Sequence, residues 1–349
     1  MAYTTIDNAE LFFQAKLYSG NGSTNAITLD GSEDLQPDWL WVKCRSDANG
    51  SQVFDALRTT YSLSPNATDA AANRASDGFT SLNSDGFTMN GSGSGGNTNV
   101  SGRTYVAFNW KAGGSSSTNS DGDINGTQTV NQTAGFSVTT YTGNGGSNQS
   151  LGHGLGVTPQ IYICKRRDNT GQWLVMNTVI DGTLDYLFLE TQGSKSNSSQ
   201  SLPTSSLVYL QNGGDANESG GTHVCYAFCE KKGYSKFGMY TGNSSTDGTY
   251  VHLGFAPAWV MCKPTDASDN WVVLNNKAHN AINSSTAPYF FYANKSFAET
   301  TDTKQLDFLS NGFKIRSSGN TINRSGPMLF MAFAESPFVN SNGVPNNGR

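Results

Sequence analysis

The chain has 349 residues and a formal net charge of −5, and charged residues make up only 14% of it. The acidic balance argues against binding to a phosphate backbone, which needs clustered Lys and Arg, and no run approaches the roughly 18 apolar residues of a membrane-spanning helix. The chain nevertheless has 19 Phe, 14 Tyr and 6 Trp to fill cores, and 39 Gly to form turns. This combination predicts an all-β protein with short strands, arranged as β-sandwich, jelly-roll-like units.

Residues 1–9 contain Tyr3 and Ile6 but no core of their own. They have neither the basic region nor the apolar stretch of a signal peptide, so we expect no secretory leader. Segments of this kind usually become ordered by docking on a partner surface. We therefore predict that residues 1–9 are an N-terminal docking segment.

Three similar passages then predict three tandem copies of one unit of about 100 residues. Copy one spans 10–112, copy two 134–232 and copy three 233–336. Each copy begins with a Tyr-x-Gly-Asn turn, continues with a Pro six residues before a Lys, and closes on a strand with an Ala-Phe pair. An Asp-Gly or Asn-Gly hairpin turn is expected at 85–86 and 311–312, with 212–213 as the weaker candidate in copy two. The Tyr, Pro and Lys positions are Tyr18, Pro37 and Lys43; Tyr141, Pro159 and Lys165; and Tyr240, Pro257 and Lys263.

The run between Pro and Lys predicts a central strand that is buried on both faces. In copy one, Trp39 and Trp41 lie on one face, and Leu40 and Val42 lie on the other. We predict that these strands and the closing Ala-Phe strands form the core of each copy. The predicted core residues are Trp39, Trp41, Phe108, Ile161, Ile163, Phe228, Trp259, Met261 and Phe333.

The pattern of copy three predicts eight short strands, the number found in a sandwich or jelly roll. Their expected ranges are 236–241, 250–255, 257–263, 270–275, 288–293, 305–309, 313–317 and 327–335. Helix signals are few, and we expect one helical turn at 69–74.

Two polar segments lie outside the copies. Residues 113–133 have almost no apolar side chain up to Val130, which predicts a flexible or extended linker that lets copy one lie apart from the other copies. The tail, residues 337–349, is rich in Asn, Gly and Pro and is expected to need a partner surface to become ordered.

The polar and sulfur residues predict no metal site and no cofactor. Five Cys cannot all pair with one another, and none has metal-ligand spacing. Buried thiols are therefore expected at Cys44, Cys164, Cys225, Cys229 and Cys262. His153, in Gly-His-Gly-Leu-Gly, is expected on a turn or strand surface. The chain has no phosphate loop, nucleophile elbow or zinc-protease motif.

Two kinds of residue keep an enzymatic alternative open. A glycosidase needs only two suitably spaced carboxylates, and the candidates are Asp38, Asp55, Asp181 and Asp307. Lys43, Lys165 and Lys263 recur at the end of the buried strand. A catalytic role is one interpretation of them; the other is that the lysine stem packs on Trp while the ammonium group reaches the rim. Core positions are expected for Trp39, Trp259 and Trp271, in preference to stacking on sugar rings.

Several segments resemble a family of uncharacterised structural proteins of marine bacteriophages, including cyanophages. They are residues 1–8, Leu35–Lys43, Phe237–Asn243, Asp307–Lys314 and Met331–Glu335. The resemblance covers nearly the whole chain and implies a virion component, such as a tail appendage, a receptor-binding protein or a capsid-attached protein. It supplies no catalytic residues.

We therefore expect a bacteriophage virion structural protein and not an enzyme, in a tail or surface appendage involved in host adhesion. A capsid decoration protein and a carbohydrate-binding module or polysaccharide depolymerase are the alternatives. The expected partners are other virion proteins and a host surface glycan, with no nucleic acid. A homo-oligomer is expected, with a trimer as the first guess, assembled in the host cytoplasm and exposed on the particle.

Overall fold

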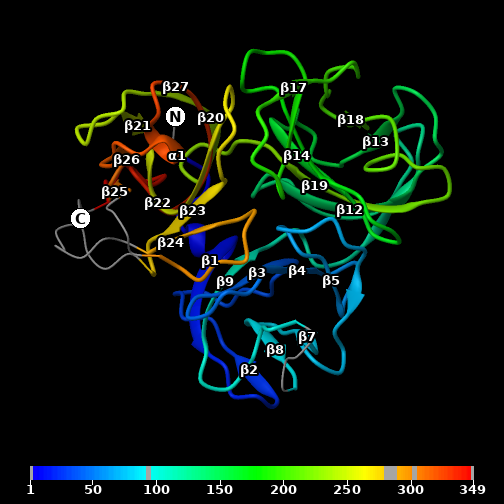
Figure 1. Ribbon diagram of the computed structural model, residues 1–349, viewed down its shortest axis with the longest axis horizontal. Helices are drawn as coiled ribbons and strands as arrows, with labels where there is room; N and C mark the ends of the chain where they lie inside the picture. Colours follow the sequence, from blue (N-terminus) through cyan, green and yellow to red (C-terminus); the bar gives the residue numbers. More distant parts are fainter. Residues whose placement is uncertain (1–2, 92–95, 279–288, 301–304, 347–349) are drawn as a thin grey trace.

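The computed structural model describes residues 3–91, 96–278, 289–300 and 305–346, and in these residues strands dominate. Helical structure there is limited to a 3-10 turn, η1 (Ala9–Leu11), and one short helix, α1 (Asn320–Asn323). The all-β prediction is confirmed. Figure 1 shows three lobes, which correspond to copy one (blue and cyan), copy two (green) and copy three (yellow to red).

The same order of strands occurs in the main sheet of every copy. It is β1-β9-β3-β4 in copy one, β12-β19-β14-β15 in copy two and β20-β27-β22-β23 in copy three. These strands are β1 (Phe13–Ser19), β3 (Trp39–Cys44), β4 (Gln52–Asp55), β9 (Thr104–Trp110), β12 (Phe136–Thr142), β14 (Ile161–Arg166), β15 (Trp173–Asn177), β19 (Thr222–Phe228), β20 (Ser235–Gly242), β22 (Phe255–Pro264), β23 (Val272–Asn275) and β27 (Gly326–Pro337).

A smaller sheet packs on the main sheet of each copy and completes a sandwich. Its strands are β2 (Asn25–Ile27), β7 (Ser81–Leu82) and β8 (Phe87–Met89); β13 (Ser150–Gly152) and β18 (Leu207–Tyr209); and β21 (Tyr250–His252), β25 (Leu306–Leu309) and β26 (Gly312–Ile315). The remaining short strands are β5 (Tyr61–Ser62), β6 (Ala72–Asn73), β16 (Asp185–Phe188), β17 (Ser196–Asn197) and β24 (Phe290–Tyr292). All eight strands predicted in copy three are present, with bounds that differ by a few residues.

The Tyr-x-Gly-Asn turn is held in the same way in every copy. In copy two, the Tyr141 hydroxyl donates to the carbonyl of Ala216 (2.7 Å), and the buried Asn217 side chain accepts from the backbone N–H of Asn144 (2.9 Å). The turn is thereby joined to the segment that precedes the last strand of the main sheet. The equivalent residues are Tyr18, Thr98, Asn99 and Asn21 in copy one, and Tyr240, Ile322, Asn323 and Asn243 in copy three.

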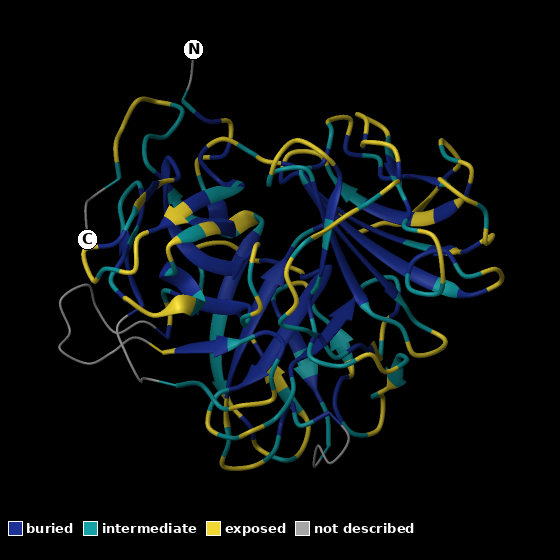
Figure 2. Ribbon diagram, turned by 45° about the horizontal axis from the view of Figure 1, so that its top comes forward, coloured by how far each residue is buried: buried dark blue, intermediate teal, exposed yellow. Residues whose placement is uncertain are grey.

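Strand β3 shows how one sheet serves two cores. Leu40 and Val42 pack in the core between the two sheets of copy one, whereas Trp39 and Trp41 belong to a cluster shared by all three copies. All six residues of β3 are buried, and the strand lies between β9 and β4. The prediction of a central strand buried on both faces is confirmed. Figure 2 shows buried strands in the interior and exposed residues mainly in the peripheral loops.

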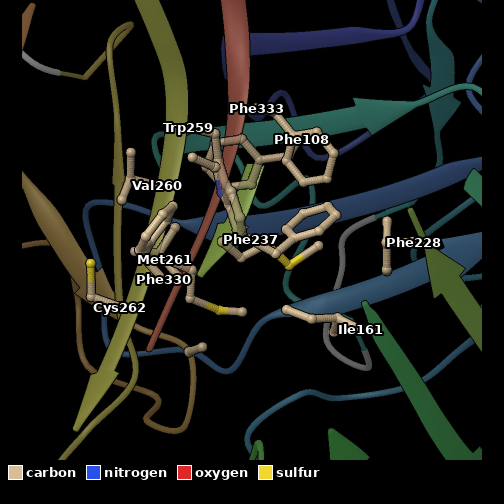
Figure 3. Close-up of a cluster of buried hydrophobic side chains, with 14 of the residues drawn as sticks. Phe108, Ile161, Phe228, Phe237, Trp259, Val260, Met261, Cys262, Phe330 and Phe333 are labelled. Atoms are coloured by element: carbon tan, nitrogen blue, oxygen red, sulfur yellow. The ribbon is translucent and has the colours of Figure 1, made fainter. Parts of the chain in front are cut away.

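Aromatic rings join the copies pairwise in the shared cluster. Rings of copies one and two meet, as do those of two and three and those of three and one, so the copies surround one core. Figure 3 shows side chains of all three copies in this cluster. One such pair for each junction is Trp39–Tyr226 (5.0 Å between ring centroids), Phe228–Phe333 (6.0 Å) and Trp110–Trp259 (5.7 Å).

The prediction that residues 113–133 form a flexible linker is wrong. It contains β10 (Ser117–Asn119) and β11 (Gly126–Asn131), and β11 pairs antiparallel with β12 at the edge of the main sheet of copy two. Ile124 is buried in the core of copy two, and the Thr129 hydroxyl donates to the carbonyl of Ala112 (2.7 Å). Pairing with β12 satisfies the backbone of this polar segment, so copy one is not free to lie apart.

Both terminal segments are ordered on their own chain, which corrects the expectation that they need a partner. The Thr4 hydroxyl donates to the carbonyl of Lys232 (2.6 Å), and Ile6 is buried. In the tail, Ser341 N–H donates to Asp7 (2.6 Å) and the Asn346 side chain donates to the carbonyl of Ser310 (3.0 Å). The ends therefore pack on each other, on the last residue of copy two and on copy three. Residues 1–2 and 347–349 of these two predicted segments lie outside the described residues.

Two smaller predictions are also wrong. Residues 69–74 form no helical turn, because Ala71 N–H donates to the carbonyl of Arg167 (2.8 Å) and Ala72–Asn73 form β6. Asn212-Gly213 follows β18. In the equivalent strands of the other copies the glycine comes earlier, since Gly86 precedes β8 and Gly312 is the first residue of β26. In copy two the turn that directly precedes β18 is instead closed by Thr204 N–H, which donates to the carbonyl of Leu207 (2.8 Å).

Candidate functional site

The nine predicted core residues do not form a surface site. All nine are buried and belong to the cluster shared by the three copies. Trp271 is also buried, and its indole N–H donates to the carbonyl of Phe188 in copy two (3.0 Å). Their role in this structure is to hold the copies together.

The three recurrent lysines connect the copies in a ring. Lys165 of copy two donates from Nζ to the carbonyls of Thr68 (3.1 Å) and Asp69 (3.0 Å) in copy one. Lys263 of copy three donates to the carbonyl of Gln192 in copy two (3.2 Å). Lys43 of copy one donates to the carbonyl of Ser296 in copy three (3.5 Å) and to that of Asn49. All three side chains are buried, so the ammonium groups do not reach the rim as expected.

Burial lowers the pKa of Lys165 from 10.5 to about 8, and the same holds for Lys43 and Lys263. Between pH 8 and 10 the unfolded chain therefore binds more protons at this lysine than the folded chain, and stability rises with pH. We expect the stability difference between the native chain and a Lys165→Met variant to grow by about 1–3 kcal/mol from pH 7 to pH 10. Denaturant unfolding at each pH measures it, and an unchanged difference would show that Lys165 keeps its ordinary pKa.

Each of the four candidate carboxylates is bonded within the fold. Asp55 accepts from Arg58 Nε (2.6 Å) and from the Tyr226 hydroxyl (2.7 Å), a buried network that joins copies one and two. Asp38 accepts from the N–H of Ala112 (2.7 Å), and burial raises its pKa. The other two pair with cations: Asp181 with Lys195 (2.6 Å) and Asp307 with Arg316 (2.6 Å). These geometries give all four a structural role.

His153 is buried, which corrects its expected place on a turn or strand surface. Its Nδ1 accepts from the N–H of Leu155 (3.1 Å), and Nε2 lies 3.3 Å from the carbonyl of Thr204. Burial lowers its pKa. All five Cys are free and buried, as expected.

The described residues contain neither a metal-binding cluster nor a helix that could span a membrane. No group of three His, Cys, Asp or Glu side chains comes together to hold a metal ion among residues 3–91, 96–278, 289–300 and 305–346. In the same ranges no helix is long and apolar enough to cross a membrane.

A polar groove of about 270 Å³ lies on copy two, where β11 and β12 meet. Hydroxyl and amide groups line it together with one cation, Arg167. Burial lowers the pKa of Arg167, and its buried Nε has no hydrogen-bond partner in the described part of the chain. The other lining residues are Thr118, Asn125, Gly126, Thr127, Thr140, Tyr141, Thr142 and Thr222.

The equivalent position in copy one shows what Arg167 lacks. Arg45 accepts a backbone hydrogen bond from Glu299 at its carbonyl (3.0 Å), just as Arg167 accepts one from Ala71 (2.8 Å). Glu299 also pairs with the Arg45 guanidinium (2.5 Å), whereas Ala71 has no carboxylate to offer. The groove of copy two is therefore a place where an anionic group would find an arginine and several hydroxyl donors.

A second and larger groove, of about 530 Å³, lies on copy three between β20 and β21. Tyr250 and His252 are exposed on its β21 side, and Lys236 bridges it by donating to the carbonyl of His252 (2.9 Å). Gly238 and Met239 line its β20 side. None of the described residues that line this groove is a carboxylate.

Sequence reasoning missed Arg167 and the buried Asn residues. Arg167 follows Lys165 by two positions, as Arg45 follows Lys43, but nothing in the sequence shows that Glu299 pairs with the Arg45 guanidinium. The buried Asn99, Asn217 and Asn323 precede the closing strands at a nearly constant distance, so aligning the copies more fully would have found them.

One comparison with known proteins gave a match. A family model described as a domain of unknown function, DUF7483, matches residues 8–337, which include all three copies and the β10–β11 segment. No curated protein and no solved structure matches the chain.

Proposed function

The chain belongs to the DUF7483 family of domains of unknown function, and we propose that it is a structural protein of a bacteriophage virion, located in a tail or surface appendage involved in host adhesion. The supporting observation is the ring of lysine and aromatic contacts that holds three sandwiches around one core. The candidate catalytic side chains are bonded within the same framework. A rigid block of this kind suits a particle component, as the resemblance of its sequence segments also implies.

The test of this proposal is the composition of the purified particle. We expect the chain to be found by mass spectrometry at a fixed number of copies per particle. Antibody labelling then decides between an appendage and the alternative of a capsid decoration protein. Absence of the chain from purified particles would refute the virion proposal.

For adhesion we propose that the groove of copy two binds an acidic glycan. Of the described residues that line it, Arg167 alone is a cation, and it lies among the hydroxyl groups of Thr127, Thr140 and Thr142. A guanidinium binds a carboxylate or sulfate through charge-assisted hydrogen bonds, and the hydroxyl groups match those of a sugar. The presence of the Arg167 guanidinium among the hydroxyl groups that line the groove carries this part of the proposal.

We expect an Arg167→Met variant to bind polygalacturonate at least about tenfold more weakly than the native chain, because it loses the charged donor. Arg166→Met is the matched control: it removes the same charge from the neighbouring position, where Arg166 already pairs with Asp168 (2.9 Å). Isothermal titration measures both affinities, with neutral dextran as the control polymer. Equal binding by native chain and Arg167→Met, or equal binding of dextran, would contradict the acidic-glycan site.

A further inference from the structure

Strand β20 is an edge of the main sheet of copy three. The N–H of Ala334 donates to the carbonyl of Tyr234 (2.7 Å), which sets the alternation of hydrogen bonds between β20 and β27. Even-numbered residues of β20 therefore bond to β27, and Phe237 and Met239 direct their N–H and C=O groups away from it. Within the described ranges no strand pairs with this side of β20.

Copy two shows how the same edge is occupied. There β11 pairs with β12, the strand equivalent to β20, and Val138 and Thr140 are opposite Thr129 and Thr127. Just before β11, Ile124 is buried beside Leu151 of β13 and forms an isolated bridge with it. The side chain of Asp123 accepts from Ser150, also of β13 (2.7 Å). In copy two, Asp123, Ile124 and strand β11 thus fill the opening between the edge of the main sheet and the smaller sheet.

Copy one closes the gap by another means. Asp30 lies across the edge of β1, where it pairs with Lys16 (3.3 Å) and with Lys277 of copy three (3.4 Å). The corresponding opening in copy three is the groove of about 530 Å³, where Gly238 takes the place of Thr139 of copy two. The ring of Phe330 packs directly against Gly238, and both residues line the groove.

We propose that the groove between β20 and β21 binds an extended strand of a separate protein chain, which pairs with the free edge of β20. We expect the bound strand to resemble residues 123–130 of copy two. It would place a carboxylate near Tyr250 and an aliphatic side chain over Val251, and its backbone would pair opposite Phe237 and Met239. A carboxylate fits because Lys236 and His252 line the groove and no acidic residue does. Exposed strand edges are common sites for such pairing. This inference uses a different groove from the glycan site and does not depend on it.

The test uses the full chain and a synthetic peptide with the sequence of residues 121–131 as the probe. Hydrogen exchange is expected to slow at the amides of Phe237 and Met239 when the peptide is added. Met239→Pro removes an N–H that points away from β27, a position where an edge strand tolerates proline. We expect this variant to bind the peptide about tenfold more weakly, and Met239→Ala, which keeps the N–H, to bind within about threefold of the native chain.

Three results would overturn the proposal. The first is equal peptide binding by Met239→Pro and the native chain while both are folded by circular dichroism. The second is equal binding of a peptide with the same composition in scrambled order. The third is concentration-dependent dimerisation of the native chain that Met239→Pro abolishes, since the occupant would then be a second copy of this chain.

Discussion

Replacing Trp259 with Ala is expected to lower the free energy of unfolding by about 3–5 kcal/mol, the usual cost of removing a buried aromatic side chain. The Trp259 ring is buried and lies 5.7 Å from Trp110 and 6.2 Å from Phe108, both in copy one. The substitution leaves a cavity at the junction of copies three and one. Thermal or denaturant unfolding of the two proteins measures the change.

Trp259→Phe is the matched control. The indole N–H of Trp259 has no hydrogen-bond partner among the residues that the structure describes, so Phe loses no such bond and keeps a ring in the cluster. We expect this variant to lose less than about half of what Ala loses. An unchanged melting curve for Trp259→Ala would show that the ring is exposed, and a sugar-stacking role for Trp259 would have to be considered again.

Lys165→Met is expected to cost about 2–4 kcal/mol at pH 7. The variant leaves the carbonyls of Thr68, Asp69 and Arg166 without the ammonium group that they bond in the native chain. Each buried polar group left without its partner costs about 1–3 kcal/mol of stability. Part of this loss is offset because the variant no longer has to bury the lysine charge. Chemical denaturation at pH 7 provides the measurement.

Lys277→Met is the comparison for Lys165→Met, because it removes a lysine that is exposed and pairs with Asp30 on the surface. We expect Lys277→Met to change the free energy of unfolding by at most about 0.5–1 kcal/mol. Similar losses for the two variants would mean that the buried lysines do not hold the copies together.

Much of the fold follows from patterns that the sequence displays. The alternation of Trp39 and Trp41 with Leu40 and Val42 predicts a strand with two buried faces, and the structure assigns each face to a different core. Local turn chemistry and apolar runs likewise located the eight strands of copy three. These features are local, because they depend on residues a few positions apart.

Features that depend on distant contacts did not follow from the sequence. Residues 113–133 are polar and appeared to be a linker, but their backbone pairs with β12, and composition does not show where a strand finds its partner. The recurrent lysines were expected at the rim because a lysine stem can pack on Trp while its ammonium group reaches solvent. Their acceptors, such as the carbonyl of Gln192 for Lys263, belong to another copy.

The candidate sites lie where the copies differ from one another. The Arg45 guanidinium pairs with Glu299, whereas the buried Nε of Arg167 has no hydrogen-bond partner among the described residues. The edge of β12 carries β11, whereas no described strand pairs with the edge of β20. Each difference leaves an unsatisfied polar group that its counterpart satisfies within the chain, and these groups are the basis for both proposed ligands.

The most direct measurement of the central claim is a cryo-electron microscopy map of the particle in which this chain is located. We expect one rigid three-lobed density per chain on the outside of a tail or surface appendage. The groove of copy two should face solution, and an extended strand of another protein should lie along β20. A map in which the lobes take varying relative positions, or in which the particle contains no such density, would contradict it.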